Sequence, residues 1–249
     1  MKKFFMFLAV IGFIAIAAND AVAQTNDAAA QELLAGAASD APVYQQIKAK
    51  FIDGGVGFMA AVLLCLILGL AVAIERIIYL SLSTTNTSKL IAKVEDALNN
   101  GGVEAALEVC RNTRGPVASI FYQGLSRMDQ GLEAVEKSVV SYGGVQAAQL
   151  ETGLTWLSLF IAMSPNLGFL GTVIGMIGAF DAIQAAGDIS PIVVASGIKV
   201  ALITTVAGLI VALILQVFFN YITSKVESLV ITMEDASVSL IDILEKEKK

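Results

Sequence analysis

The chain has 249 residues, of which 56% are hydrophobic and only 15% are charged, and its mean hydropathy is +0.76. Soluble domains contain about 45–50% apolar and about 25% charged residues, so this composition excludes an ordinary water-soluble protein. The net charge of −6 offers no basic surface for nucleic acid. The sequence contains no histidine, which removes the commonest general base and metal ligand, and its two cysteines do not form a zinc motif. We therefore expect a membrane protein that is not an enzyme and that needs no metal or other cofactor.

The first 23 residues have the pattern of a secretory signal peptide. Lys2 and Lys3 precede the apolar run Phe4 to Ala18, and Ala21-Val22-Ala23 supplies a small-residue cleavage site. The apolar run of about 15 residues is shorter than the ~20 that a membrane span needs, although an uncleaved first helix is the alternative. We predict cleavage after Ala23, with the mature chain starting outside the cytoplasm.

Residues 24–54 form a polar, alanine-rich segment that we expect outside the cytoplasm. Val43, Tyr44, Ile47 and Phe51 have the spacing of one helical stripe. The segment is either a short amphipathic helix at the membrane surface or a flexible tail, and the sequence does not decide between the two.

Three further segments are long and apolar enough to cross a bilayer. They are residues 55–82, 153–182 and 191–222. Lysine and arginine are concentrated in residues 83–152 and 223–249, whereas the connection 183–190 has neither. The positive-inside rule therefore places 83–152 and the C-terminus in the cytoplasm and 183–190 on the opposite side of the membrane.

The segment 83–152 is predicted to be a small helical domain. Thr87 or Ser88 begins a helix that we expect to stop at Asn99-Asn100-Gly101-Gly102, and helical spacing resumes from Val103 to Gly115-Pro116. No alternating strand pattern occurs. The expected fold is therefore an all-α integral membrane protein with three transmembrane helices and long cytoplasmic helical extensions.

Rows of small residues mark one face of the second and of the third span. They recur every three or four residues, and such rows let membrane helices approach closely. Ordinary helix packing is sufficient to explain them. The glycines are Gly168, Gly171, Gly175 and Gly178 in the second span, and Gly197 and Gly208 in the third.

Three threonines lie in the middle of these spans, Thr172 in the second and Thr204 and Thr205 in the third. Hydroxyl groups in membrane helices commonly bond to the carbonyl four residues earlier. The alternative is that these hydroxyls line a pore and pass protons or orient water.

Lys199 is the only basic residue within the second and third predicted spans, and an intramembrane charge is a functional candidate. Its side chain has three possible destinations. It extends to the outer surface, it pairs with Asp181 at similar depth, or it pairs with a carboxylate of another subunit.

Two stretches resemble motifs of the MotA/TolQ/ExbB proton-channel family. They are Asn166-Leu-Gly-Phe-Leu-Gly-Thr-Val-Ile-Gly-Met-Ile-Gly-Ala-Phe180 and Gly197-Ile-Lys-Val-Ala-Leu-Ile-Thr-Thr-Val-Ala-Gly-Leu209. With the three-span layout, the resemblance covers about residues 55–225. The extension before the first span is most similar to the ExbB branch.

The resemblance implies a homo-oligomeric ring, usually of five copies, in the lipid bilayer of a bacterial inner membrane, with residues 24–54 and 183–190 on its periplasmic side. The ring surrounds the membrane helix of an ExbD-like, single-span partner that bears an essential aspartate. Protons pass through that aspartate and the motion energises a TonB-like protein, which drives transport across the outer membrane. Thr172 and Thr205 match the pore threonines of the family. A TolQ-like subunit of the Tol–Pal envelope system and a non-conducting membrane scaffold are the alternatives.

The chain departs from the family at one position. Many relatives carry a glutamate in the third-helix motif, where this chain has Val200, preceded by Lys199. The glutamate's role therefore has no direct counterpart, and either the partner's aspartate acts with Thr172 and Thr205 alone or Lys199 sets the local field.

Overall fold

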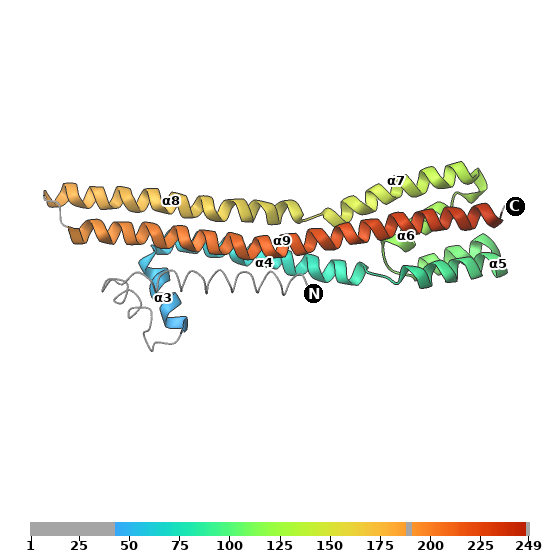
Figure 1. Cartoon of the computed structure of the whole chain (residues 1–249), viewed down its shortest axis with the longest axis horizontal. Helices are drawn as coiled ribbons and strands as arrows, with labels where there is room; N and C mark the ends of the chain where they lie inside the picture. The colour runs from blue at the N-terminus through green and yellow to red at the C-terminus, as the bar shows by residue number, and fades with distance from the viewer. Residues whose placement is uncertain (1–42, 188–190, 248–249) are drawn as a thin grey trace, which may run out of the picture. The chain divides into compact units, whose positions relative to one another are not determined.

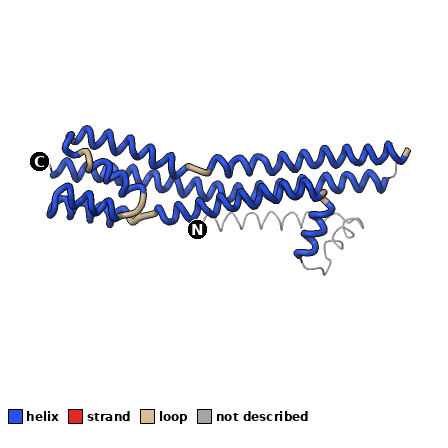
Figure 2. The backbone as a smooth tube through the Cα atoms, turned by 180° about the vertical axis from the view of Figure 1, so that it is seen from behind, coloured by secondary structure: helices blue, strands red, loops and turns tan. Residues whose placement is uncertain are grey.

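The computed structural model describes residues 43–187 and 191–247, and every regular element in these ranges is helical (Figures 1 and 2). The expected all-α class is thereby confirmed. The predicted signal peptide, residues 24–42 and the end of the 183–190 connection lie outside the described residues. The helices are α3 Val43–Asp53, α4 Val56–Ser83, α5 Thr87–Asn112, α6 Pro116–Leu125, the 3-10 helix η1 Met128–Gln130, α7 Leu132–Glu151, α8 Leu154–Ala186 and α9 Pro191–Glu247.

Three of these helices are long and apolar enough to cross a membrane, as the sequence predicts. They are α4, α8 and α9, with 28, 33 and 57 residues. At ~1.5 Å per residue, α9 is about 85 Å long and must extend far beyond a hydrocarbon core of ~30 Å. The third span and the C-terminal segment of the sequence therefore belong to one uninterrupted helix.

From Phe51 onward the chain forms one compact unit. Within it, α8 packs along the N-terminal half of α9, and α4 lies against both (Figure 1). The C-terminal half of α9 is instead surrounded by α5, α6 and α7. Because α7 is separated from α8 only by Thr152 and Gly153, the α5–α7 bundle connects directly to the apolar helices.

The α5–α7 bundle has a core of fully buried aliphatic and aromatic side chains. The largest are Ile120, Phe121 and Leu125 of α6, which meet Val135 and Val139 of α7. Full burial of such side chains contributes about 1.5–3 kcal/mol each relative to exposure. The bundle therefore has the interior of a water-soluble domain.

Helix α5 contains the interruption that the sequence places at residues 99–102. Gly102 has φ 70°, a backbone conformation that glycine adopts without steric cost, and the helix continues on its far side. Because the backbone of Gly102 is not helical, α5 consists of two helical segments that meet at a kink there, which confirms the predicted stop at residues 99–102.

The stripe predicted between Val43 and Phe51 is helical, because these residues lie in α3. The described structure thus favours the amphipathic helix over the flexible tail. Its expected place at a membrane surface stays a prediction.

Candidate functional site

The backbones of α8 and α9 approach closely where the two rows of small residues meet. A Cβ atom on Gly168 would lie 3.1 Å from the carbonyl oxygen of Thr204, and one on Gly208 would lie 2.5 Å from that of Ser164. A Cβ on Gly175 would meet Ala201 at 3.2 Å. A Cβ at Gly208 would therefore displace one of the helices, and a Cβ at Gly168 or Gly175 would make a contact tighter than ordinary van der Waals distance, so the spacing of the two rows permits the close approach.

The six predicted packing glycines do not all behave alike. Gly171 lies against the side chain of Thr204, and Gly197 lies against Ala179. A Cβ atom on Gly178, by contrast, would have no neighbour within 4 Å among the described residues. The glycine row of α8 therefore contacts α9 as far as Gly175, whereas Gly178 has no close neighbour on α9.

Thr172 and Thr205 meet between α8 and α9, and their two hydroxyl groups are hydrogen-bonded to each other. The Thr172 hydroxyl also lies 3.1 Å from the carbonyl oxygen of Gly168 and 3.4 Å from that of Ala201. The Thr205 hydroxyl lies 3.2 Å and 3.3 Å from the same two oxygens. Two hydroxyls therefore share two backbone acceptors, one from each helix.

The absent side chain of Gly168 makes this arrangement possible, because Thr205 packs directly on the backbone there. The sequence predicts both threonines as site residues. It does not identify the two carbonyl oxygens, since backbone acceptors leave no residue-type signal.

Thr204 occupies a different environment from its neighbour. Only 1% of it is exposed, and its hydroxyl donates to Ala201 on its own helix at 2.8 Å. Successive helical residues differ by about 100° in direction, which turns Thr204 toward Gly171 and away from the shared hydroxyl contact. Its contacts are those of a buried packing residue, and a role in a proton path stays a prediction.

Lys199 forms an ion pair that the sequence analysis does not anticipate. Its Nζ atom lies 2.8 Å from Oδ2 of Asp53, the last residue of α3. The two side chains are 56% and 39% exposed in the single chain. Asp181, the intramolecular partner considered from the sequence, is exposed on α8. No local pattern indicates this pair, because 146 residues separate its members.

Val200 lies beside this ion pair. The side chain of Val200 faces the turn between α3 and α4, where a Cβ on Gly55 would come within 3.8 Å of it. On the same turn, Gly54 is buried against Ile203 of α9. Val200 is therefore packed against the chain's own α3–α4 turn, and the charge at this level belongs to Lys199 and Asp53.

Among residues 43–187 and 191–247, no group of three His, Cys, Asp or Glu side chains is placed to hold a metal ion. Three apolar helices and a hydroxyl pair between two of them instead define a polytopic helical membrane protein.

The sequence matches the MotA/TolQ/ExbB proton channel family over residues 112–235, from the end of α5 through most of α9. It is 31% identical to ExbB-like 1 of Synechocystis over 179 residues, which are 70% of each chain. The chain therefore belongs to the MotA/TolQ/ExbB family, and the resemblance predicted from its motifs is confirmed.

Two further relatives have names in the ExbB branch. An ExbB homolog of Methanothermobacter thermautotrophicus is 35% identical over 162 residues, or 65% of this chain and 57% of that protein. The biopolymer transport protein ExbB of Xanthomonas campestris is 37% identical over 113 residues, or 45% and 43% of the two chains. The chain thus spans little more than half the length of the first relative and less of the second.

Proposed function

We propose that this chain is an ExbB-like, ring-forming subunit of an inner-membrane motor that runs on the proton-motive force and energises TonB-dependent outer-membrane transport. The proposal rests above all on the hydroxyl contact between Thr172 and Thr205, which is partly buried between two apolar helices. Membership of a proton channel family and the ExbB names of the relatives support it.

The chain itself supplies hydroxyls but no acid at this level. In α8 and the first 33 residues of the 57-residue α9, Asp181 and Lys199 are the only charged side chains, and neither bonds to the two threonines. A threonine hydroxyl orients and relays a proton but does not hold one as a titratable carrier. The proposal therefore requires a carboxylate from outside the chain, the aspartate of an ExbD-like, single-span partner.

Several apolar side chains of α8 and α9 are exposed in the single chain. Lipid or further copies of the chain must cover these side chains, and both are expected for a ring of five subunits in a bilayer. The exposed residues include Phe169, Val173 and Phe180 on α8 and Leu202, Val206 and Leu213 on α9.

Proton flux in liposomes that contain the chain and its single-span partner tests the proposal. An inward-directed potential is worth about 2.3 kcal/mol per elementary charge per 100 mV, so conduction is measurable as a pH change in the lumen. We expect Thr172→Val and Thr205→Ala each to reduce this flux by at least about tenfold, because each removes one of the two hydroxyls. Assembly with the partner should be unchanged.

Ser164→Ala is the matched control on α8. The Ser164 hydroxyl is also buried, but it donates to Phe160 of its own helix at 2.8 Å and takes no part in the threonine contact. Flux unaffected by loss of either threonine hydroxyl would contradict the proposed path, and no flux with any partner would favour the scaffold. Recovery of Tol–Pal proteins instead of a TonB-like protein with the purified complex would favour the TolQ-like role.

A further inference from the structure

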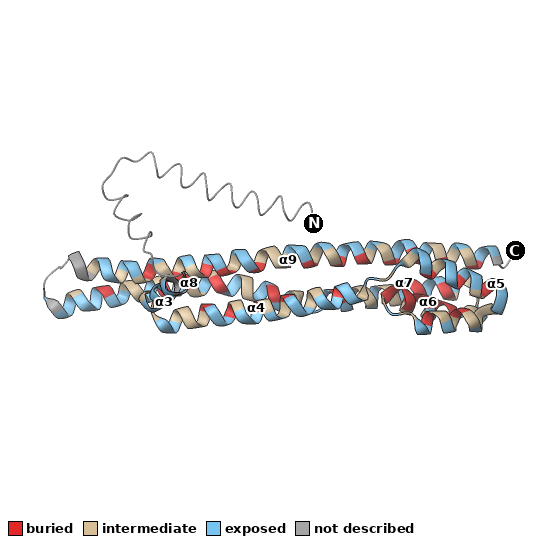
Figure 3. Cartoon of the chain, turned by 90° about the horizontal axis from the view of Figure 1, so that it is seen from below, coloured by how far each residue is buried: buried red, intermediate tan, exposed pale blue. Residues whose placement is uncertain are grey.

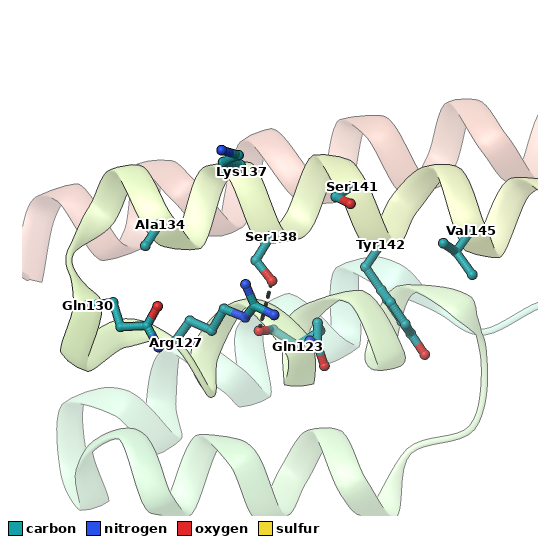
Figure 4. A pocket seen from close by; sticks show the side chains of 9 residues that line it. All are labelled: Gln123, Arg127, Gln130, Ala134, Lys137, Ser138, Ser141, Tyr142 and Val145. Carbon is teal, nitrogen blue, oxygen red and sulfur yellow. Dashed lines mark hydrogen bonds between the residues drawn. The ribbon is translucent and has the colours of Figure 1, made fainter.

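A cavity of about 460 Å³ lies between α6, η1 and α7, within the α5–α7 bundle (Figure 4). We call it the α6–α7 cavity. Ser138 lines this cavity and is only 5% exposed. Its hydroxyl donates a hydrogen bond to the backbone carbonyl of Gln123 at 3.4 Å. This bond, drawn as the dashed line in Figure 4, connects α7 to α6. Besides Ser138, the polar side chains that line the cavity are Gln123, Arg127, Gln130, Lys137, Ser141 and Tyr142.

The charge of the cavity is opposite to that of the chain. The sequence has 22 acidic and 16 basic residues, yet the cavity is lined by Arg127 and Lys137 and by no carboxylate. Asp129 and Glu133 belong to the same elements but do not line it. Neither Arg127 nor Lys137 forms an ion pair with any residue that the structure describes. Two exposed cations without an ion-pair partner among the described residues therefore line one cavity.

The N-terminus of α7 adds to this positive potential. The helix has 20 residues and begins after Gly131, which has φ 98° and no side chain to cap the first turn. Its first backbone N–H groups are left without a side-chain acceptor, and the helix dipole places partial positive charge at the same end. Gln130 and Ala134, on either side of this start, both line the cavity.

The other lining groups suit an oxyanion with an organic part. Gln123, Gln130 and Ser141 carry hydrogen-bond donors, and Tyr142 supplies both a hydroxyl and an aromatic wall. An arginine presents a planar fork of donors that matches phosphate, and a lysine adds a mobile point charge. The cavity volume falls in the range of about 300–1,000 Å³ that small-molecule sites occupy.

We propose that the α6–α7 cavity binds a small phosphate-bearing molecule, with Arg127 and Lys137 contacting the phosphate groups. The cavity lies on helices remote from Thr172 and Thr205, so the inference does not depend on the proposed proton path. A dianionic or larger phosphate matches two cations and a helix N-terminus better than a single carboxylate does.

Isothermal titration calorimetry of the full-length protein in detergent, without divalent cations, tests this inference with inorganic pyrophosphate and ATP as probes. We expect saturable binding of at least one probe. Affinity should fall as salt is raised, because the contacts are ionic and partly exposed. Arg127→Gln combined with Lys137→Gln should weaken binding by at least about tenfold, because it removes both charge-assisted contacts.

Arg111→Gln is the matched control, because it removes one positive charge from the bundle at a different groove. Arg111 lies beside Glu104 and Glu108 of α5. This variant should bind the probe as the unmodified protein does. The inference is overturned if neither probe binds below ~10 mM, or if the double variant binds as tightly as the unmodified protein. Binding of an acidic peptide with no binding of either phosphate probe would also overturn it and would assign the cavity to a protein segment.

Discussion

The hydroxyl contact between Thr172 and Thr205 can exist in two directions. Each hydroxyl has one proton, so the several short oxygen–oxygen contacts around the pair are alternatives to one another. In one arrangement Thr172 donates to Thr205, which donates to the carbonyl of Gly168. In the other, Thr205 donates to Thr172, which donates to Gly168 or Ala201. The pair can therefore reverse its polarity without leaving a hydroxyl proton unbonded, which is the property that a relay requires.

Burial also changes the reactivity of Cys110, which lies in α5, outside the three apolar helices. The side chain is 3% exposed, and burial raises the pKa of its thiol to about 11. Since the thiolate is the reactive form, we expect Cys110 to react with maleimide at pH 7.5 about a hundredfold more slowly in the folded protein than after unfolding of the bundle in guanidinium. The measurement is the time course of modification by mass spectrometry, in a Cys65→Ala background.

Ser88→Cys in the same background provides the control, because Ser88 is exposed on the same helix and should react quickly in the folded protein. The raised pKa also has a consequence for stability. In the unfolded chain the Cys110 thiol ionises in its ordinary pH range, whereas the buried thiol of the folded protein stays protonated there. The contribution of this thiol to the free energy of unfolding is therefore complete below that range and is lost as the pH rises toward about 11. Rapid modification of folded Cys110 at neutral pH would contradict its burial.

At the scale of elements, the contact between α8 and α9 depends on backbone approach more than on side-chain volume. Membrane helices have little hydrophobic force between them, because lipid is as apolar as the side chains, so close packing supplies the attraction. The same approach brings the two threonines within reach of each other. Packing and site are therefore one feature, and a change that separates the helices should affect both.

Gly208→Ala should disrupt this contact. The added Cβ would lie 2.5 Å from the carbonyl oxygen of Ser164, which is backbone and cannot move aside alone. Overpacking of this kind costs about 1–3 kcal/mol, so we expect a lower thermal unfolding temperature in detergent. We also expect reduced proton flux, because the hydroxyl contact lies within one helical turn of Gly208.

Gly178→Ala is the corresponding change where no close contact exists. Among the described residues nothing lies within 4 Å of the added Cβ, and alanine is the better helix former. The thermal unfolding temperature of the single chain should therefore be unchanged or slightly higher. Equal destabilisation by the two substitutions would show that the glycine rows do not act through the contact between α8 and α9.

Much of this arrangement could be predicted from the sequence, and the exceptions have physical causes. Spacing of three and four residues predicts the facing rows, and the motif predicts Thr172 and Thr205 as a pair, whose hydroxyl groups meet in the structure. The spacing of a row does not show where its contact with the other helix ends. It therefore could not predict that Gly175 contacts α9 and that Gly178 does not. Nor could it separate the adjacent Thr204 and Thr205, since the helix rotation relative to α8 is set by packing. The pairing of Lys199 with Asp53 depends on the α3–α4 turn, which no local pattern reveals.

At the scale of the whole molecule, α9 is the element that connects the apolar helices to the bundle. Its buried positions recur every three or four residues along both halves (Figure 3). They change in size along the helix, from Ala201, Thr204 and Gly208 against α8 to Leu229, Leu240 and Leu244 within the bundle. Small residues permit backbone approach where three helices are apolar, whereas large ones fill a core that water would otherwise reach.

The distribution of basic residues predicts how α9 is oriented across the membrane. Lysine and arginine are abundant in the α5–α7 bundle and at the C-terminus but absent from residues 183–190, so the bundle should lie in the cytoplasm. Gln184→Cys at the end of α8 and Asp235→Cys on α9 are both at exposed positions. In a background without Cys65 and Cys110, an impermeant maleimide should label Gln184→Cys in intact spheroplasts and Asp235→Cys only after lysis.

Each pattern of labelling has a distinct physical meaning. The reverse pattern would place the bundle outside and invert the direction in which protons reach Thr172 and Thr205. Labelling of both sites from the same side would mean that α9 does not cross the membrane, despite its length. The expected pattern would set the hydroxyl contact between a periplasmic end, where Lys199 and Asp53 are paired, and a cytoplasmic bundle joined to both helices. Protons moving inward would then pass the ion pair before the threonines, which makes the level of Lys199 the entrance of the proposed path.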